Sequence, residues 1–309
     1  MDFTMYLLDT LVFMGIFALL SMSLNVEYGY TGLGNFGKVA FFMAGAYAYA
    51  VTAALGWPVY LSLVMAALIA GALGAVVSLP ALRLREDYLA IVTLSFGEIL
   101  RIFVKAEQWL AGGVWGKTVP SAFAGLGLSP KTMAWANVLL VWAILAGVFL
   151  FLHLLMNTPY GRVLRGIRED DVAVQVLGKS LVSYKAQALM VGSAIAGVAG
   201  GLFAQYIRFI DPYMFLPLVT FLVWVMLILG GPANHWGALI GALIVEFFNR
   251  GSRIVKDYIA LPFDPHNVQF VLFGLLIIFL LLYRPYGLFR EKPMRTGAEV
   301  EVSKWQSSP

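Results

Sequence analysis

The sequence has 309 residues, of which 61% are hydrophobic and 12% are charged. Soluble globular proteins average about 45–50% apolar and about 25% charged residues, so lipid must solvate much of this chain. The formal net charge of +4 is too small to indicate a nucleic-acid partner. Cysteine is absent, which excludes disulfides and thiolate metal sites.

The three histidines lie far apart without metal-ligand spacing, and no nucleophile–base arrangement stands out. We therefore expect no metal, no cofactor and no catalytic residue. The first apolar segment has neither a basic start nor a cleavage-site pattern, so it is interpreted as a membrane span rather than a signal peptide.

The hydrophobic runs predict an all-α polytopic membrane protein. A helix crosses the hydrocarbon core in about 20 residues, and that rule gives about nine spans, with eight to ten allowed. The predicted spans are 5–26, 36–56, 59–82, 88–106, 134–156, 184–206, 218–232, 235–250 and 268–283.

The distribution of Lys and Arg predicts the orientation in the plasma membrane. With nine spans, the loops after the third and fifth spans and the segment after the last span fall on one side. These regions and Lys38 carry 13 of the 21 basic residues, whereas Arg250, Arg253 and Lys256 fall on the other side. We expect the N-terminus outside and the C-terminus in the cytoplasm.

The stretch AGGVWGKT, residues 111–118, resembles a phosphate-binding loop except that Ala111 replaces the first glycine. It lies between the fourth and fifth spans, on the predicted extracytoplasmic side. A span precedes it instead of a strand, and Val119-Pro120 interrupts the helix that would receive the phosphates. We interpret it as a glycine-rich turn, so any ATPase must be a separate chain.

Charged residues within spans mark either function or pairing. Glu98 and Arg101 lie three residues apart and can pair on one helical face. They either line a transport pathway or form a structural ion pair near the outer end of the span. Asp9 and Glu246 are expected at the interface rather than as proton carriers.

Glycine clusters interrupt two segments, GYTGLGNFGKVAFFMAGAYA at 29–48 and LGGPANHWGALIGALIVEFF at 229–248. Interrupted helices at matching places in two halves are typical of transporters built from an inverted repeat. Their free backbone groups could form a polar strip for a solute without buried charged side chains. Alternatively, both are ordinary turns between helices. The predicted pathway residues are Thr31, Gly32, Gly34, Asn35, Gly37, Phe41, Glu98, Gly231 and Gly237.

The sixth span carries small residues at every fourth position in two adjacent rows. Such rows allow close helix packing within the chain or between subunits. The rows are Ser193, Gly197, Gly201 and Gly192, Ala196, Gly200.

The loop 157–183 contains a predicted amphipathic helical unit. Thr158 and Pro159 suit a helix start, and Gly178 suits a helix end. The unit either lies in the membrane interface or docks a soluble partner through its acidic turn and apolar edge. The predicted docking residues are Arg162, Arg165, Arg168, Glu169, Asp170, Ala173, Leu177 and Gly178.

At REDDVAVQVLG the chain resembles the cytoplasmic coupling motif of ABC importer permeases, and it is similar to those for branched-chain amino acids. Further collinear matches cover nearly the whole chain: GYTGLGNFGKVAFFMAGAYA, RLREDYLAIVTLSFGEILR, AGG at 111–113, PYGRVLRGIREDD and LGGPANHWGALIGA. The chain departs from the family at Asn35 and Lys38, where a small or polar residue followed by His or Gln is common. Lys38 puts a cation at a position next to the cavity, which leaves the substrate open. The motifs do not specify the substrate either, because permeases for urea and short amides share them.

The resemblance implies a permease subunit, not an enzyme, with a translocation domain at 1–290 and a cytoplasmic tail at 291–309. It implies a homologous second permease, two cytoplasmic ATP-binding subunits and an extracytoplasmic binding protein, whose ATP-driven closure would push on the loop. The substrate would be branched-chain or related hydrophobic amino acids. The alternative from another class is a stand-alone ion-coupled transporter that uses Glu98 or Glu246.

Overall fold

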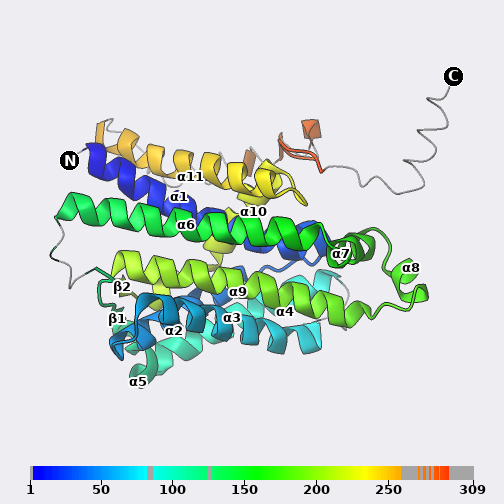
Figure 1. Ribbon diagram of the computed structural model, residues 1–309, viewed down its shortest axis with the longest axis horizontal. Coiled ribbons are helices and arrows are strands. Elements are labelled where there is room, and N and C mark those ends of the chain that lie inside the picture. Colours follow the sequence, from blue (N-terminus) through cyan, green and yellow to red (C-terminus); the bar gives the residue numbers. More distant parts are fainter. Residues whose placement is uncertain are drawn as a thin grey trace.

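The computed structural model describes residues 3–81, 86–123, 127, 129–258, 271, 274–275, 278–279, 282–284 and 286–291. Long helices run side by side along the molecule, with a short two-stranded ladder at one end and a pair of short helices at the other (Figure 1). The long helices are α1 (Phe3–Leu24), α2 (Lys38–Ala54), α3 (Val59–Ala81), α4 (Glu86–Ala106), α6 (Pro130–Met156), α9 (Leu181–Ile207), α10 (Pro217–Gly230) and α11 (His235–Tyr258).

Short elements join the long helices. They are the π-helical turn η1 (Asn25–Gly29), α5 (Gln108–Ala111), η2 (Gly113–Trp115), β1 (Lys117–Thr118), α7 (Pro159–Glu169), α8 (Asp171–Val176), β2 (Phe209–Ile210) and η4 (Pro212–Met214). β1 and β2 pair antiparallel, with Lys117 opposite Ile210 and Thr118 opposite Phe209.

Eight of the nine predicted spans coincide with helices. Seven agree within a few residues at each end, and α11 continues to Tyr258, beyond the predicted end at 250. Among the residues that the structure describes, five segments are long and apolar enough to cross a membrane: Phe3–Gly29, Val59–Leu79, Pro130–Met156, Leu181–Ile207 and Pro212–Gly230. α2 is apolar but has only 17 residues, and α4 and α11 carry more charge. The ninth predicted span, 268–283, lies largely outside the described residues, so the count of nine stays a prediction.

Local sequence signals explain where several helices begin. Ser129 caps α6 by accepting a hydrogen bond from the N–H of Thr132, and Pro130 occupies the first helical position. Asn234 performs the same role for α11, because its Oδ1 accepts the N–H of Trp236 at 3.0 Å.

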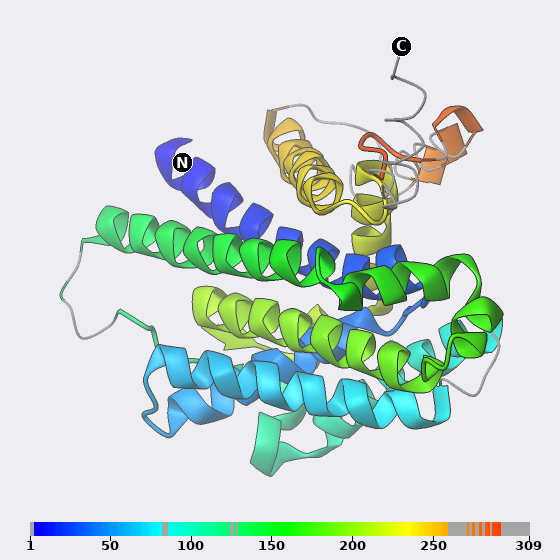
Figure 2. The ribbon, with the colours of Figure 1, turned by 45° about the vertical axis from the view of Figure 1, so that its right-hand side comes forward.

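α9 lies at the centre of the bundle. It packs against α2 and α3 on one side and against α1 on another, and Figure 2 shows it between the α2–α3 pair and α6. A side chain at Gly200 would collide with the carbonyl oxygen of Phe42 in α2, and one at Gly197 would collide with α3 at Ala66 and Ala70. The small residues therefore serve packing within the chain, as one of the two predicted interpretations held.

The stretch at 111–118 forms the predicted glycine-rich turn. Gly112 and Gly116 both have φ of 73°, a backbone conformation that residues with a side chain rarely adopt. Lys117 and Thr118 then enter the β ladder instead of starting a helix. The helix N-terminus that a phosphate-binding loop requires is therefore missing at this site.

Candidate functional site

The two predicted interruptions lie against each other. The first break comprises residues 25–37, which are η1 and the irregular segment before α2, and the second break comprises residues 231–234, between α10 and α11. The side-chain oxygen of Asn25 accepts the backbone N–H of Ala233 at 2.8 Å. The hydroxyl of Tyr30 lies 3.1 Å from Nε2 of His235. Segments some 200 residues apart thus form one site, within hydrogen-bond distance of each other.

Aromatic side chains fill the space beside the first break. The ring of Trp224 in α10 stacks on Phe36 with centroids 4.8 Å apart and meets Tyr28 edge-on at 4.6 Å. Its indole N–H donates to the carbonyl oxygen of Asn35 at 3.3 Å. The site therefore has an apolar aromatic wall that also satisfies a backbone carbonyl of the broken segment.

A fully buried ion pair holds the first break together. Nζ of Lys38 lies 2.6 Å from Oε1 of Glu27, and both side chains are at most 1% exposed. Asn35 donates from Nδ2 to the other carboxylate oxygen of Glu27 at 2.9 Å. Because the two charges face each other and the Glu27 carboxylate also accepts from Asn35, the pair can persist without water.

This pair corrects the prediction of a strip without buried charged side chains. Lys38 stands out in the sequence as a departure from the family, whereas Glu27 was not predicted as a site residue, although the two are only 11 residues apart. The available signal was a carboxylate before the glycines of the first break and a cation just after them.

The predicted pathway residues of the first break are mostly buried. Thr31 donates to the carbonyl oxygen of Glu27, and Phe41 stacks on Phe96 with centroids 6.0 Å apart. A side chain at Gly37 would collide with the carbonyl oxygen of Thr93 in α4. By contrast, a Cβ at Gly34 would meet only a ring carbon of Phe36, at 3.8 Å.

The remaining predicted pathway residues serve packing and pairing. Gly231 has φ of 109°, and a side chain there would collide with the carbonyl oxygen of Phe289. A Cβ at Gly237 would lie 2.6 Å from the carbonyl oxygen of Gly230. Glu98 pairs with Arg101 on α4, with the Glu98 side chain 40% exposed.

The other carboxylate considered for ion coupling is also paired. Glu246 lies 3.0 Å from Nε of Arg250, whose guanidinium also pairs with Asp9 of α1. Glu246 is buried within this cluster, which joins α1 to α11.

The segment α7–α8, called the docking unit below, closes the same end of the bundle. Pro159 starts α7, and Asp170 starts α8 by accepting the N–H groups of Val172 and Ala173 at 3.0 Å each. Gly178 follows α8 with φ of 75°. The predicted helix start and end are therefore confirmed.

The docking unit has an inner and an outer face. Leu164 and Ile167 are buried, while Val172, Val176 and Leu177 are 63%, 83% and 76% exposed. Of the predicted docking residues, six are exposed: Arg162, Glu169, Asp170, Ala173, Leu177 and Gly178. Arg165 and Arg168 instead point inward to the breaks, which the sequence pattern did not reveal.

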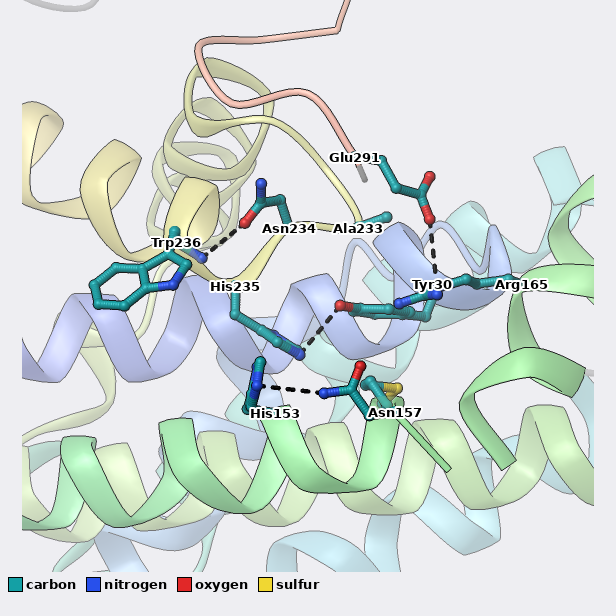
Figure 3. A pocket seen from close by; sticks show the side chains of 10 residues that line it. Tyr30, His153, Asn157, Arg165, Ala233, Asn234, His235, Trp236 and Glu291 are labelled. Atoms are coloured by element: carbon teal, nitrogen blue, oxygen red, sulfur yellow. Dashed lines mark hydrogen bonds and ion pairs between the residues drawn. The ribbon is translucent and has the colours of Figure 1, made fainter. Parts of the chain in front are cut away.

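A cavity of about 260 Å³ lies between the breaks and the docking unit. Figure 3 shows Trp236 and His235 on one side, and Tyr30 beside Arg165 and below Glu291 on the other. The end of α6 contributes His153, Met156 and Asn157. Charged, amide and aromatic groups therefore surround one space at this end of the bundle.

Comparison with known proteins adds to this geometry. Residues 6–281 match the family model described as branched-chain amino acid transport system, permease component. The chain belongs to this family. It is therefore a transport protein of the membrane, with several helices able to span it.

The chain has relatives with two names, LivM and LivH. The probable branched-chain amino acid transport permease protein LivM of Methanocaldococcus jannaschii is 30% identical, over 93% of this chain and 94% of its own. The high-affinity LivM of Escherichia coli K12 is 31% identical, over 88% of this chain and 67% of its own. The probable LivH of M. jannaschii is 26% identical, over 92% of this chain and 91% of its own. No solved structure matches the chain.

Proposed function

We propose that this chain is a permease subunit of an ATP-driven importer and forms a translocation pathway for branched-chain or related hydrophobic amino acids. The observation that carries the proposal is the family match over residues 6–281, together with relatives named for branched-chain amino acid transport. The meeting of two interrupted helices in one site supports a pathway there, since irregular backbone at membrane depth requires a protein-lined environment.

Four partner chains follow from this proposal: a homologous permease, two cytoplasmic ATP-binding subunits and an extracytoplasmic binding protein. Relatives named LivM and LivH, of which M. jannaschii and E. coli each have both, support pairing with a second permease. The docking unit would face the cytoplasm, which places the N-terminus outside and the C-terminus inside the cell membrane.

The outer face of α8 supports docking of an ATP-binding subunit. Val172, Val176 and Leu177 project from the bundle, so they offer apolar area to a soluble partner. ATP-driven closure of that partner can shift the permease only if the partner binds the two permease states with different affinity.

The test is uptake into proteoliposomes that contain the permease pair, the ATP-binding subunits and the binding protein. ATP-dependent uptake of leucine, isoleucine or valine would support the proposal, whereas preferred uptake of urea or short amides would reassign the substrate. Uptake that follows an ion gradient without the ATP-binding subunits would contradict an ATP-driven mechanism.

Docking is tested separately by Ala173→Arg and Glu169→Arg. Both should abolish co-purification of the ATP-binding subunits or uncouple transport, because they change the exposed surface of the docking unit. Val114→Arg is the matched control, since Val114 is 51% exposed in η2, far from the docking unit. Normal ATP-driven uptake by both docking variants would remove the docking role.

A further inference from the structure

Arg165 and Arg168 lie one turn apart on α7 and face the breaks. Nη1 of Arg168 donates to the carbonyl oxygen of Gly29 at 2.5 Å, at the end of η1. The guanidinium of Arg165 lies over the ring of Tyr30, 5.2 Å from its centroid. Both arginines therefore contact the first break directly.

The same two arginines reach the second break through Glu291. Oε2 of Glu291 accepts from Nη2 of Arg168 at 2.6 Å, and its Oε1 lies 3.4 Å from Nε of Arg165. Figure 3 shows Glu291 above Arg165, at the edge of the cavity. One carboxylate thus joins both arginines of the docking unit.

Backbone hydrogen bonds fix the segment that carries Glu291 to the second break. The N–H groups of Leu288 and Phe289 donate to the carbonyl oxygens of Leu229 and Gly230, each at 2.9 Å. Asn234 donates from Nδ2 to the carbonyl oxygen of Arg290 at 3.2 Å. Segment 286–291 therefore occupies the carbonyl groups that the end of α10 leaves without helical partners.

We propose that Arg165, Arg168 and Glu291 form a clasp that passes movement of the docking unit to both interrupted helices at once. The inference rests on the proposed ATP-driven transport and assigns these side chains a positioning role within it. Glu291 begins the region predicted as a separate tail, and the clasp makes it part of the transport machinery.

The geometry explains why both breaks would move together. A shift of α7 displaces Arg168, which holds Gly29 and Glu291 simultaneously, so neither break can change without a change at the other. Charge-assisted hydrogen bonds are stronger than neutral ones and have defined directions, which suits them to transmit such a shift.

The test measures uptake and ATP hydrolysis in the reconstituted complex. Glu291→Gln should lower leucine uptake per ATP hydrolysed by about tenfold, within the range typical of coupling between sites. Glu291→Asp, which keeps the charge, should recover part of the loss. Arg284→Gln is the matched control, because Arg284 carries an exposed charge near segment 286–291 but lies outside the clasp and the docking unit.

A second pair of variants separates charge pairing from misfolding. Glu291→Arg places a cation beside two arginines and should uncouple the complex, and adding Arg168→Glu should restore part of the coupling. An uptake-to-hydrolysis ratio for Glu291→Gln equal to that of Arg284→Gln would overturn the clasp. Absence of any ATP-dependent uptake by the unmodified complex would instead overturn the proposed function.

Discussion

Glu27 and Lys38 have no exposed surface, so each charge depends on the other for stability. Removal of one partner leaves an unpaired buried charge, which costs about 3–5 kcal/mol, whereas replacing both with uncharged groups is often nearly neutral. The pair therefore defines the conformation of the first break more than it adds to the net stability of the protein.

Lys38→Met should destabilise the protein by about 3–5 kcal/mol, and the double change Glu27→Gln with Lys38→Met should recover most of that loss. The measurement is thermal unfolding of the purified permease in detergent. Thr132→Ala, at the exposed start of α6, serves as a control for general effects of substitution. A single variant as stable as the unmodified protein would show that the ion pair is not maintained.

Two glycines of the first break should respond differently to the same substitution. Gly37→Leu should lower the yield of folded complex together with uptake, because any side chain there collides with α4 at Thr93. Gly34→Leu should retain yield, since a Cβ at that position has an ordinary contact with Phe36 only. Uptake lost at full yield in the Gly34 variant would support a pathway at this position; full yield for the Gly37 variant would contradict the packing role.

At the residue scale, the sequence predicted that the glycines mattered but not why. Counting glycines identified Gly37, yet its partner Thr93 lies on another helix and no local pattern marks the contact. Glu27 was missed because it is embedded in an apolar span, where its pairing depends on a turn that reverses the chain.

At the scale of elements, the small residues of α9 set the distance between central helices. Gly200→Leu should destabilise the bundle by about 1–3 kcal/mol or more, because it forces α9 away from α2. Gly147→Leu in α6 is the control, since a Cβ there meets nothing within 4 Å and leucine has the higher helix propensity. Folded yield and unfolding temperature measure both variants, and equal yields would argue against close α2–α9 packing.

Apolar runs predicted the helices well because membrane helices satisfy their backbone hydrogen bonds locally. The docking unit could also be predicted from the sequence, since Thr158, Pro159 and Gly178 are local signals for the start and end of a helix. The clasp could not be predicted, because Glu291 and Arg168 are 123 residues apart in the sequence and only the fold brings them into contact.

At the scale of the whole molecule, the ladder of β1 and β2 and the docking unit lie at opposite ends of the bundle (Figure 1). The isolated chain should neither bind nor hydrolyse ATP. Lys117→Ala should leave ATP hydrolysis of the assembled complex unchanged, because Lys117 lies in the ladder rather than at a helix N-terminus. Radiolabelled nucleotide binding and phosphate release measure both, and loss of nucleotide binding in an intact Lys117 complex would contradict this account.

The contacts of the first break also constrain the order of folding during synthesis. Glu27 meets Lys38 only 11 residues later, so its charge is neutralised soon after α1 leaves the ribosome. Asn25 must wait for Ala233, and Arg168 must wait for Glu291. Until then η1 holds the Asn25 side chain without its final partner, which is costly at membrane depth. A chain that stops before Glu291 would therefore insert its helices and yet leave both breaks incomplete, a state that quality-control proteases could recognise.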